Sequence, residues 1–183
     1  MPELLICIAI VVVLLIFGIS VYNKLVPLRN NVKNAFAQIE TQLQRRFDLI
    51  PNLVETVKGY SSHEKELLEN IAASRHKFIN ATSNAEKMAI DTQLTASLRS
   101  LFSYVENYPE LKANINFMNL QNELSQTEEK LAFARQFYND AVTMYNNKRQ
   151  TFPNIIIAKI CGFKEEELFF AEDGAEKAPR VQF

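Results

Sequence analysis

The first two dozen residues contain an uninterrupted apolar stretch that a soluble fold would find hard to bury. From Leu4 to Val21 the chain carries no charged residue, and only Gly18 and Ser20 interrupt its apolar character. About 18 residues of helix, rising about 1.5 Å each, extend about 27 Å, close to the hydrocarbon thickness of a bilayer. A core helix of a soluble protein rarely lacks charges over such a length. The stretch therefore predicts a transmembrane helix from Leu4 to Val21.

A cleaved signal peptide would require a basic region before the apolar stretch and small residues at a cleavage site after it. Here Met1-Pro2-Glu3 precedes the stretch and Tyr22-Asn23-Lys24 follows it. Neither segment fits a cleavage signal. We therefore interpret residues 1–23 as an uncleaved, single-pass membrane anchor.

The charges that flank the anchor predict its orientation. Lys24, Arg29 and Lys33 follow the span closely, whereas Glu3 precedes it. Because positively charged flanks stay in the cytoplasm, we expect the N-terminus outside and the helical domain in the cytoplasm, at the inner membrane. In that reducing compartment neither Cys7 nor Cys161 is expected to form a disulfide.

Residues 24–152 have the composition and periodicity of a single helical domain. Only 4 glycines and 6 prolines occur in 183 residues, and no segment alternates apolar and polar residues as a half-buried strand does. We therefore predict an all-α protein: a transmembrane helix followed by a long antiparallel up-down bundle of four helices. Residues 153–183 form a tail that is first apolar and then acidic.

The first bundle helix is marked by an apolar stripe with steps of three and four residues, which define one face of a helix. Pro51 falls within the stripe, where it removes a hydrogen-bond donor. Because the stripe keeps its phase across Pro51, we expect a kink there rather than a helix end. The stripe comprises Leu25, Leu28, Val32, Ala35, Ile39, Leu43, Phe47, Ile50, Val54 and Val57.

Capping signals divide the rest of the domain. The segments Ser61–Glu64 and Ser83–Glu86 have the form of capping boxes, and Pro109 suits the first turn of a fourth helix. The second and third helices either alternate up and down or stack end to end, and we favour alternation. The fourth helix carries a coiled-coil-like heptad pattern that ends at Phe152-Pro153: Ala113, Phe117, Leu120, Leu124, Thr127, Leu131, Ala134, Tyr138, Ala141 and Tyr145.

The start of the tail is too apolar to lie free in water and too short to span a bilayer. We expect Ile155, Ile156, Ile157 and Phe163 to cover the end of the bundle, to touch the membrane or to pair with another subunit. Gly162 suits the end of a short helix in this segment. In the up-down layout the tail returns to the membrane side of the bundle.

The sequence offers no set of residues typical of catalysis or cofactor binding. The 2 histidines, His63 and His76, do not have the four-residue spacing of a helical zinc motif. Cys161 has no histidine near it in sequence, and the scarcity of glycine argues against a phosphate-binding loop. A net charge of −1, with basic and acidic residues interspersed, does not favour nucleic acid. We therefore expect no enzyme activity, no cofactor, no metal and no nucleic-acid partner.

Polar residues near Pro51 are the strongest candidates for an interaction site or for specifying the bundle. Arg45 and Asp48 lie three residues apart on one helical face and can pair. Arg46 lies beside the apolar stripe, where it either meets a carboxylate such as Glu128 or belongs to a recognition surface near the Pro51 kink.

Two further arginines and two Tyr-Asn pairs raise the same alternatives. Arg75 and Arg135 are either partners of acids on neighbouring helices or parts of a charged docking face. The side chains of Tyr138-Asn139 and Tyr145-Asn146 either form a solvated polar face, which we favour at any single position, or hydrogen-bond to a neighbouring protomer.

Several strings of residues together resemble the LemA family of bacterial membrane proteins. They are Gln42–Val54 (QLQRRFDLIPNLV), Val57-Lys58-Gly59-Tyr60, Ala134-Arg135-x-x-Tyr138-Asn139 and the closing Pro179–Phe183 (PRVQF). The resemblance implies one membrane span followed by a long antiparallel helical bundle. It implies no particular enzyme activity, because the family has no settled catalytic function.

These patterns favour a non-catalytic, membrane-anchored scaffold or assembly protein that acts through protein–protein contacts. Its expected partners are the lipid bilayer, further copies of itself and an unidentified membrane or cytoplasmic protein. The alternative is a membrane sensor or regulatory subunit for a partner enzyme, a role that a single span and a kinked juxtamembrane helix would also serve.

Overall fold

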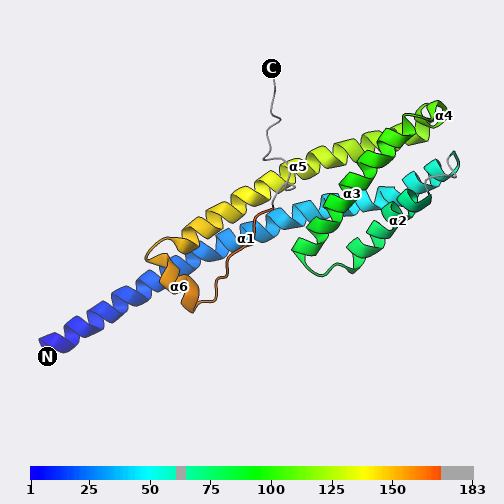
Figure 1. Ribbon diagram of the computed structural model, residues 1–183. Helices are drawn as coiled ribbons and strands as arrows, with labels where there is room; N and C mark the ends of the chain where they lie inside the picture. Colours follow the sequence, from blue (N-terminus) through cyan, green and yellow to red (C-terminus); the bar gives the residue numbers. More distant parts are fainter. Residues whose placement is uncertain (61–64, 170–183) are drawn as a thin grey trace, which may run out of the picture. The chain divides into compact units, whose positions relative to one another are not determined.

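The computed structural model describes residues 1–60 and 65–169, and every regular element in these ranges is a helix (Figure 1). The predicted all-α class is therefore confirmed. The capping box expected at Ser61–Glu64 lies outside the described residues. The helices are α1 (Pro2–Lys58), α2 (Lys65–Asn80), α3 (Asn84–Val105), α4 (Pro109–Lys112), α5 (Ile115–Gln150) and α6 (Asn154–Ile160).

The described residues pack as two compact units. The first unit contains residues 1–38 and 134–169, and the second contains residues 39–133. Helices α1 and α5 each contribute residues to both units. Helices α2, α3 and α4 belong to the second unit, and α6 belongs to the first.

Helix α1 continues without interruption from the apolar stretch into the bundle. It passes through Pro51 without ending, as the constant phase of the stripe predicts. Within the described residues α1 is the one helix long and apolar enough to cross a membrane, and only 6% of its apolar window is buried. The stripe is buried as predicted at Leu25, Val32, Ala35, Ile39, Leu43, Phe47, Ile50, Val54 and Val57.

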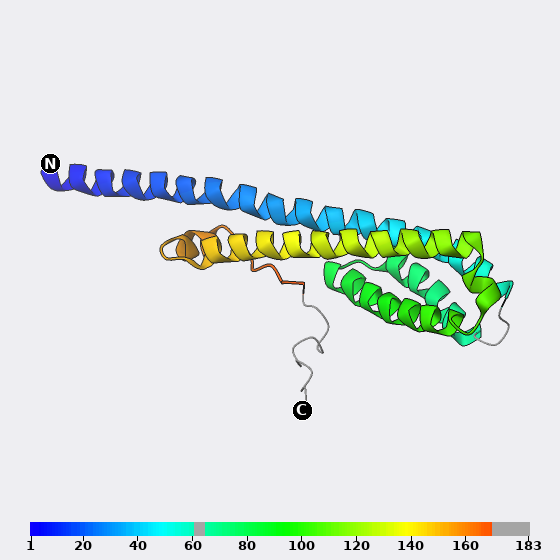
Figure 2. The same cartoon turned by 90° about the horizontal axis from the view of Figure 1, so that it is seen from above.

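Helices α2 and α3 pack side by side, as both views show (Figures 1 and 2), so they do not stack end to end. The predicted capping box at the start of α3 is present. The Ser83 hydroxyl accepts a hydrogen bond from the Glu86 N–H at 3.2 Å, and the Glu86 carboxylate accepts one from the Thr82 N–H at 3.1 Å. These bonds satisfy donors that the helix end would otherwise leave unpaired.

The single fourth helix expected from Pro109 is in fact two helices. The short helix α4 ends at Lys112, and α5 begins at Ile115. Asn114 causes the new start, because its Oδ1 atom accepts hydrogen bonds from the N–H groups of Asn116 at 2.9 Å and Phe117 at 3.1 Å. Ala113, which the heptad pattern included, is consequently exposed. The pattern holds beyond this point, with Phe117, Leu124, Thr127, Leu131, Tyr138 and Tyr145 buried.

Helix α6 ends at the predicted glycine. Gly162 has a φ of 72°, a left-handed conformation that glycine adopts readily. The Phe163 N–H donates to the Ala158 carbonyl at 2.9 Å, and the Gly162 N–H donates to the Lys159 carbonyl at 3.3 Å. These two bonds form a Schellman motif, which satisfies the last carbonyls of α6.

Candidate functional site

Arg46 is a buried charged residue of the second unit, with 3% of its surface exposed. Its Nη1 atom lies 2.6 Å from Asp91 Oδ1, 2.7 Å from Glu128 Oε2 and 3.0 Å from Thr95 Oγ1. The pair with Glu128 is the one expected from the sequence. Asp91 and Thr95 could not be identified in advance, because nothing in the sequence indicated which face of the third helix meets α1. Arg46 therefore links α1 to both α3 and α5.

The arrangement around Arg46 fits a role in specifying the packing of these helices. Arg46 is 3% exposed and Asp91 is fully buried. Burying such charges costs desolvation free energy, which close ion pairing and hydrogen bonding offset. A shift in the register of α3 or α5 would leave a charge buried without its partner, so this register is strongly favoured.

The other polar residues near Pro51 form more exposed contacts. Arg45 Nη2 lies 3.3 Å from Glu123 Oε2 on α5, and Asp48 Oδ1 accepts a hydrogen bond from Gln44 at 3.0 Å. Arg75 Nη2 lies 3.6 Å from the same Asp48 oxygen. The predicted pair of Arg45 with Asp48 is therefore wrong, because neighbouring helices supply each of them with an opposite charge. Arg75 is an interhelical partner of an acid, one of its two predicted roles.

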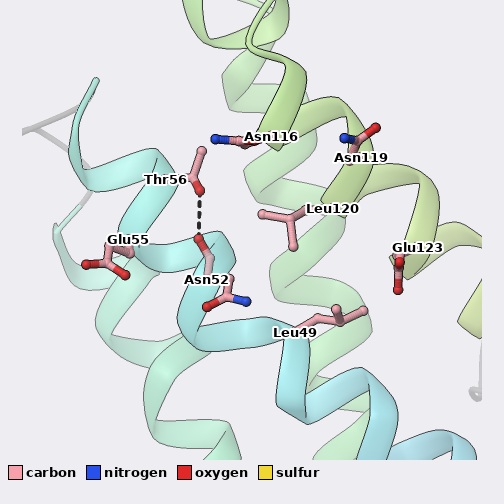
Figure 3. A pocket seen from close by; sticks show the side chains of 8 residues that line it. All are labelled: Leu49, Asn52, Glu55, Thr56, Asn116, Asn119, Leu120 and Glu123. Atoms are coloured by element: carbon pink, nitrogen blue, oxygen red, sulfur yellow. Dashed lines mark hydrogen bonds between the residues drawn. The ribbon is translucent and has the colours of Figure 1, made fainter.

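A polar pocket of about 590 Å³ lies next to Pro51 in the second unit (Figure 3). Pro51 itself is exposed. Two polar groups of the pocket are already engaged: the Thr56 hydroxyl donates to the Asn52 carbonyl at 2.8 Å, and Glu123 pairs with Arg45. The remaining side-chain amides and the Glu55 carboxylate offer both donors and acceptors to a polar ligand. The lining residues are Leu49, Asn52, Glu55, Thr56, Asn116, Asn119, Leu120 and Glu123.

The first unit contains a repeated arrangement of tyrosine and asparagine on α5, which we call the Tyr-Asn ladder (Tyr138, Asn139, Tyr145 and Asn146). It binds the main chain of residues 164–169, which we call the strap. The Tyr145 hydroxyl donates to the Lys164 carbonyl at 2.7 Å, and the Tyr138 hydroxyl donates to the Glu167 carbonyl at 2.9 Å.

Each asparagine of the ladder makes two hydrogen bonds to one strap residue. Asn146 Nδ2 donates to the Glu166 carbonyl at 2.8 Å, and its Oδ1 accepts from the Glu166 N–H at 3.2 Å. Asn139 bonds to Phe169 in the same way, at 2.9 Å and 2.7 Å. The sequence left two alternatives for these side chains, a solvated polar face or a neighbouring protomer, but the structure places their hydrogen bonds on the chain's own tail.

The spacing of the ladder matches the geometry of an extended chain. One heptad of helix rises about 10.5 Å, and three extended residues cover about 10 Å. Tyrosines seven residues apart therefore reach strap residues three apart, as do the asparagines. Because all these bonds go to main-chain groups, they fix the conformation and register of the strap without depending on its side chains.

Two phenylalanines, Phe163 just before the strap and Phe169 at its last position, each pack against an arginine. The Arg29 guanidinium lies over the Phe163 ring, 5.0 Å from the centroid of that ring. The rings of Phe163 and Tyr22 make an edge-on contact, with their centroids 5.5 Å apart. The guanidinium of Arg135 lies 4.7 Å from the centroid of the Phe169 ring. The arginines thus contribute cation–π contacts. The structure places the predicted candidate Arg135 against the strap.

Burial makes the tyrosine hydroxyls of the ladder harder to deprotonate. It raises the pKa of Tyr138 above the ordinary value of 10.0, and the Glu166 and Glu167 carboxylates raise this pKa further. Burial likewise raises the pKa of Tyr145, assisted by Glu166 and opposed by Arg149 and Arg29. Both hydroxyls are therefore hydrogen-bond donors at neutral pH.

The predicted tail contacts lie against the part of α1 that leaves the apolar stretch. Ile155 and Ile157 are half-buried, Phe163 is buried, and Ile156 is 49% exposed. A methyl group added at Gly18 would lie 3.7 Å from Ile157 Cδ1. Ile157 therefore packs beside Gly18 of the apolar stretch, and Phe163 packs on Tyr22 just after it.

Of the three residues considered for catalysis, the structure describes two. His76 and Cys161 are exposed, and His63 lies outside the described residues. Among residues 1–60 and 65–169, no group of three or more His, Cys, Asp or Glu side chains is placed to hold a metal ion.

The fold and the ladder define a class: an all-helical protein in which one long apolar N-terminal helix continues into the bundle and the C-terminal strap is bound along a second long helix. The model of the LemA family matches residues 35–183, so the chain belongs to the LemA family.

Three relatives match most of the chain at low sequence identity. The chain is 25% identical over 152 residues to Protein LemA of Metamycoplasma hominis, which covers 82% of this chain and 69% of that protein. It is 22% identical over 186 residues to Magnetosome protein MamQ 2 of Paramagnetospirillum magneticum, covering 87% of this chain and 68% of the relative. Magnetosome protein MamQ of Magnetospirillum gryphiswaldense matches to the same extent.

Proposed function

We propose that this protein is a non-catalytic scaffold, anchored in the bacterial inner membrane by residues 4–21, which acts through protein–protein contacts and self-associates. The unburied apolar part of α1 supports the anchor, because a helix of a soluble core would be mostly buried. Lys24 and Lys33, both exposed just after the span, support an outside N-terminus and a cytoplasmic helical domain.

The observation that carries self-association is a pair of large apolar side chains exposed on α5. Phe137 is 56% exposed and Met144 is 62% exposed, and both belong to the first unit. They are one heptad apart, so they lie on the same side of the helix. Each directly precedes a tyrosine of the Tyr-Asn ladder, and an asparagine directly follows that tyrosine. The asparagines bind the strap, so Phe137 and Met144 lie on the opposite side of the tyrosines from the asparagines. The flank with Phe137 and Met144 is therefore available to a second copy, which would remove both side chains from water.

We also propose that the long helices form the antiparallel four-helix bundle expected from the sequence. The order of contacts supports this layout. In the first unit Phe36 contacts Tyr138, with ring centroids 5.7 Å apart. In the second unit Arg46 of α1 pairs with Glu128 of α5, and Tyr60, two residues after α1, bonds to Asn114, the residue before α5. Within this unit, positions that increase along α1 therefore meet positions that decrease along α5.

Self-association is tested by the mass of the full-length protein in detergent, measured by light scattering over a range of concentrations. We expect an oligomer, and we expect the double variant Phe137→Ser/Met144→Ser to shift the mass toward the monomer. Met118→Ser is the matched control, because Met118 is an exposed apolar residue of α5 in the second unit, at 43%. A wild-type protein that stays monomeric at high concentration would contradict self-association.

Crosslinking in membranes, followed by mass spectrometry, separates the scaffold from the regulatory subunit. Crosslinks between copies of this chain, carried by residues close to Phe137 and Met144, would support the scaffold. A single different protein crosslinked in constant stoichiometry, without self-crosslinks, would favour a regulatory subunit.

A further inference from the structure

The turn after α5 and helix α6 expose three large apolar side chains. Phe152 is 77% exposed, Ile156 is 49% exposed and Ile160 is 76% exposed. They follow one another at intervals of four residues, the spacing of a single helix side where the chain is helical. A helix of only 7 residues, about 10 Å long, cannot cross a bilayer. These side chains are therefore suited to an apolar surface that covers them without the segment crossing the bilayer.

The position of α6 beside α1 fixes its depth relative to the apolar stretch. Ile157 Cδ1 lies 3.7 Å from where a methyl group on Gly18 would be, and Phe163 packs on Tyr22. Both views show α6 beside this part of α1 (Figures 1 and 2). Gly18 lies inside the apolar stretch, about 4.5 Å before its end at Val21 at 1.5 Å per residue. All these residues belong to the first unit, so their arrangement is internal to one compact body.

We propose that α6 and the preceding turn enter the boundary between headgroups and acyl chains on the side of the membrane where α1 emerges. This inference depends on the proposed anchoring of α1. If Gly18 lies within the hydrocarbon, then the side chains packed at the same level meet lipid, and Ile156, Ile160 and Phe152 are suited to it. Interfacial segments bury such side chains several ångströms into the acyl region.

The charges near α6 fit a lipid surface as the partner. Lys159 and Lys164 are exposed on either side of Gly162, where they can reach lipid phosphates while the isoleucines contact acyl chains. Glu165, the first acid of the strap, is paired with Arg149 at 2.5 Å. Its negative charge is thereby partly neutralised next to the proposed lipid surface. A second copy covering Ile156 and Ile160 is the competing occupant, which the experiment below distinguishes.

The exposed Cys161 is a natural reporter next to Ile160. In the full-length protein with Cys7→Ala, Cys161 would be labelled with the fluorophore NBD, and the protein reconstituted into vesicles of phosphatidylcholine and phosphatidylglycerol. Quenching would be compared for lipids that carry a nitroxide on the headgroup, at acyl carbon 5 and at acyl carbon 12. We expect at least twofold stronger quenching from the two shallow positions than from carbon 12.

Two comparisons test whether α6 itself carries the effect. The double variant Ile156→Asp/Ile160→Asp should lose most of the quenching, because carboxylates leave the acyl region. Ile79→Asp, which changes an isoleucine 55% exposed on α2 in the second unit, should not. A label at Gln136→Cys, with both native cysteines replaced, should be quenched little, because Gln136 lies about 21 Å along α5 from the end of that helix at Gln150.

The outcomes separate this inference from the proposed anchoring. Protein that does not float with the vesicles in a density gradient would contradict the anchor. Protein that floats while its Cys161 label escapes quenching would contradict the lipid contact of α6 and leave the anchor intact. Unchanged quenching in Ile156→Asp/Ile160→Asp would also overturn the inference. Fluorescence that is shielded from nitroxide lipids and depends on the protein-to-lipid ratio would assign Ile156 and Ile160 to a second copy instead.

Discussion

At the scale of single residues, the buried Arg46 and the exposed Arg45 are adjacent in sequence but differ in their energetic roles. The Arg46 and Asp91 side chains are 4% and 1% exposed, whereas the Arg45 and Glu123 side chains are 50% and 48% exposed. Water screens the second pair and not the first. The charge of Arg46 therefore matters for stability in a way that the charge of Arg45 does not.

Arg46→Leu should lower the free energy of unfolding by about 3–5 kcal/mol, because it leaves Asp91 buried without a cation. Chemical denaturation in detergent, followed by circular dichroism, measures this change. The neighbouring variant Arg45→Leu is the control and should cost about 1 kcal/mol or less. Equal losses in the two variants would show that the Arg46 network does not have the proposed role.

The pH dependence of strap binding follows from the raised pKa values of Tyr138 and Tyr145. A hydroxyl whose pKa is higher in the folded state stabilises that state fully below its unfolded pKa of about 10. This stabilisation is lost as the pH rises through the folded pKa. A phenolate also cannot donate to the carbonyls of Lys164 and Glu167. The strap should therefore detach in alkali and remain bound at neutral and mildly acidic pH.

A spin label at Leu168→Cys, with both native cysteines replaced, would report this release by electron paramagnetic resonance. We expect the label to become mobile as the pH rises above about 10. In the background Tyr138→Phe/Tyr145→Phe, the label should already be more mobile at pH 7 and should show no alkaline transition. An identical transition in that background would assign the release to other groups.

At the scale of elements, the sequence predicted what depends on local periodicity. The stripe of α1 and the heptads of α5 were identified because apolar residues recur every three or four positions and face a core. The break between α4 and α5 was missed, because Ala113 stays in phase with the heptads and nothing else interrupts the pattern. Asn114 was the available signal, since asparagine is favoured at a helix start.

The candidate site was less predictable than the helices, because its partners are distant in sequence. The predicted pair of Arg45 with Asp48 considered only one helix, whereas Glu123 and Arg75 approach from others. The strap has no periodicity of its own, so its extended conformation was not foreseen. The repeated Tyr-Asn pair was noticed, but only the fold shows that its partner is the tail of the same chain.

Asn114→Ala should lower the stability of the second unit by about 1 kcal/mol, because α5 loses the acceptor for two N–H groups in its first turn. Denaturant unfolding in detergent measures the change. Asn114→Asp is the matched control: it keeps the acceptor but removes the donor that bonds to the Tyr60 hydroxyl at 2.9 Å. If Asn114→Asp destabilises as much as Asn114→Ala, the bond to Tyr60 and not the cap is the important contact.

At the scale of the whole molecule, exposed lysines lie both after the apolar stretch of α1 and next to α6, the two places where we propose that the protein meets the membrane surface. Lys24 and Lys33 are exposed on α1 after the span, and Lys159 and Lys164 are exposed next to α6. Arg29 differs from them, because it is half-buried over the Phe163 ring. Lys24 and Lys33 are therefore the residues with which to test orientation without disturbing the packing of the tail.

The orientation can be tested with a cysteine at Asn147, an exposed position on α5, in a protein without Cys7 and Cys161. If the helical domain is cytoplasmic, this cysteine should resist a membrane-impermeant thiol reagent in intact bacterial cells and react once the cells are permeabilised. Lys24→Glu/Lys33→Glu removes the two exposed positive charges on which the proposed orientation rests. In that background a measurable fraction of the protein should become reactive in intact cells. Ready labelling of this cysteine in intact cells, with Lys24 and Lys33 unchanged, would place the helical domain outside. The partners of the protein and the lipid leaflet that α6 contacts would then have to be sought on the outer face.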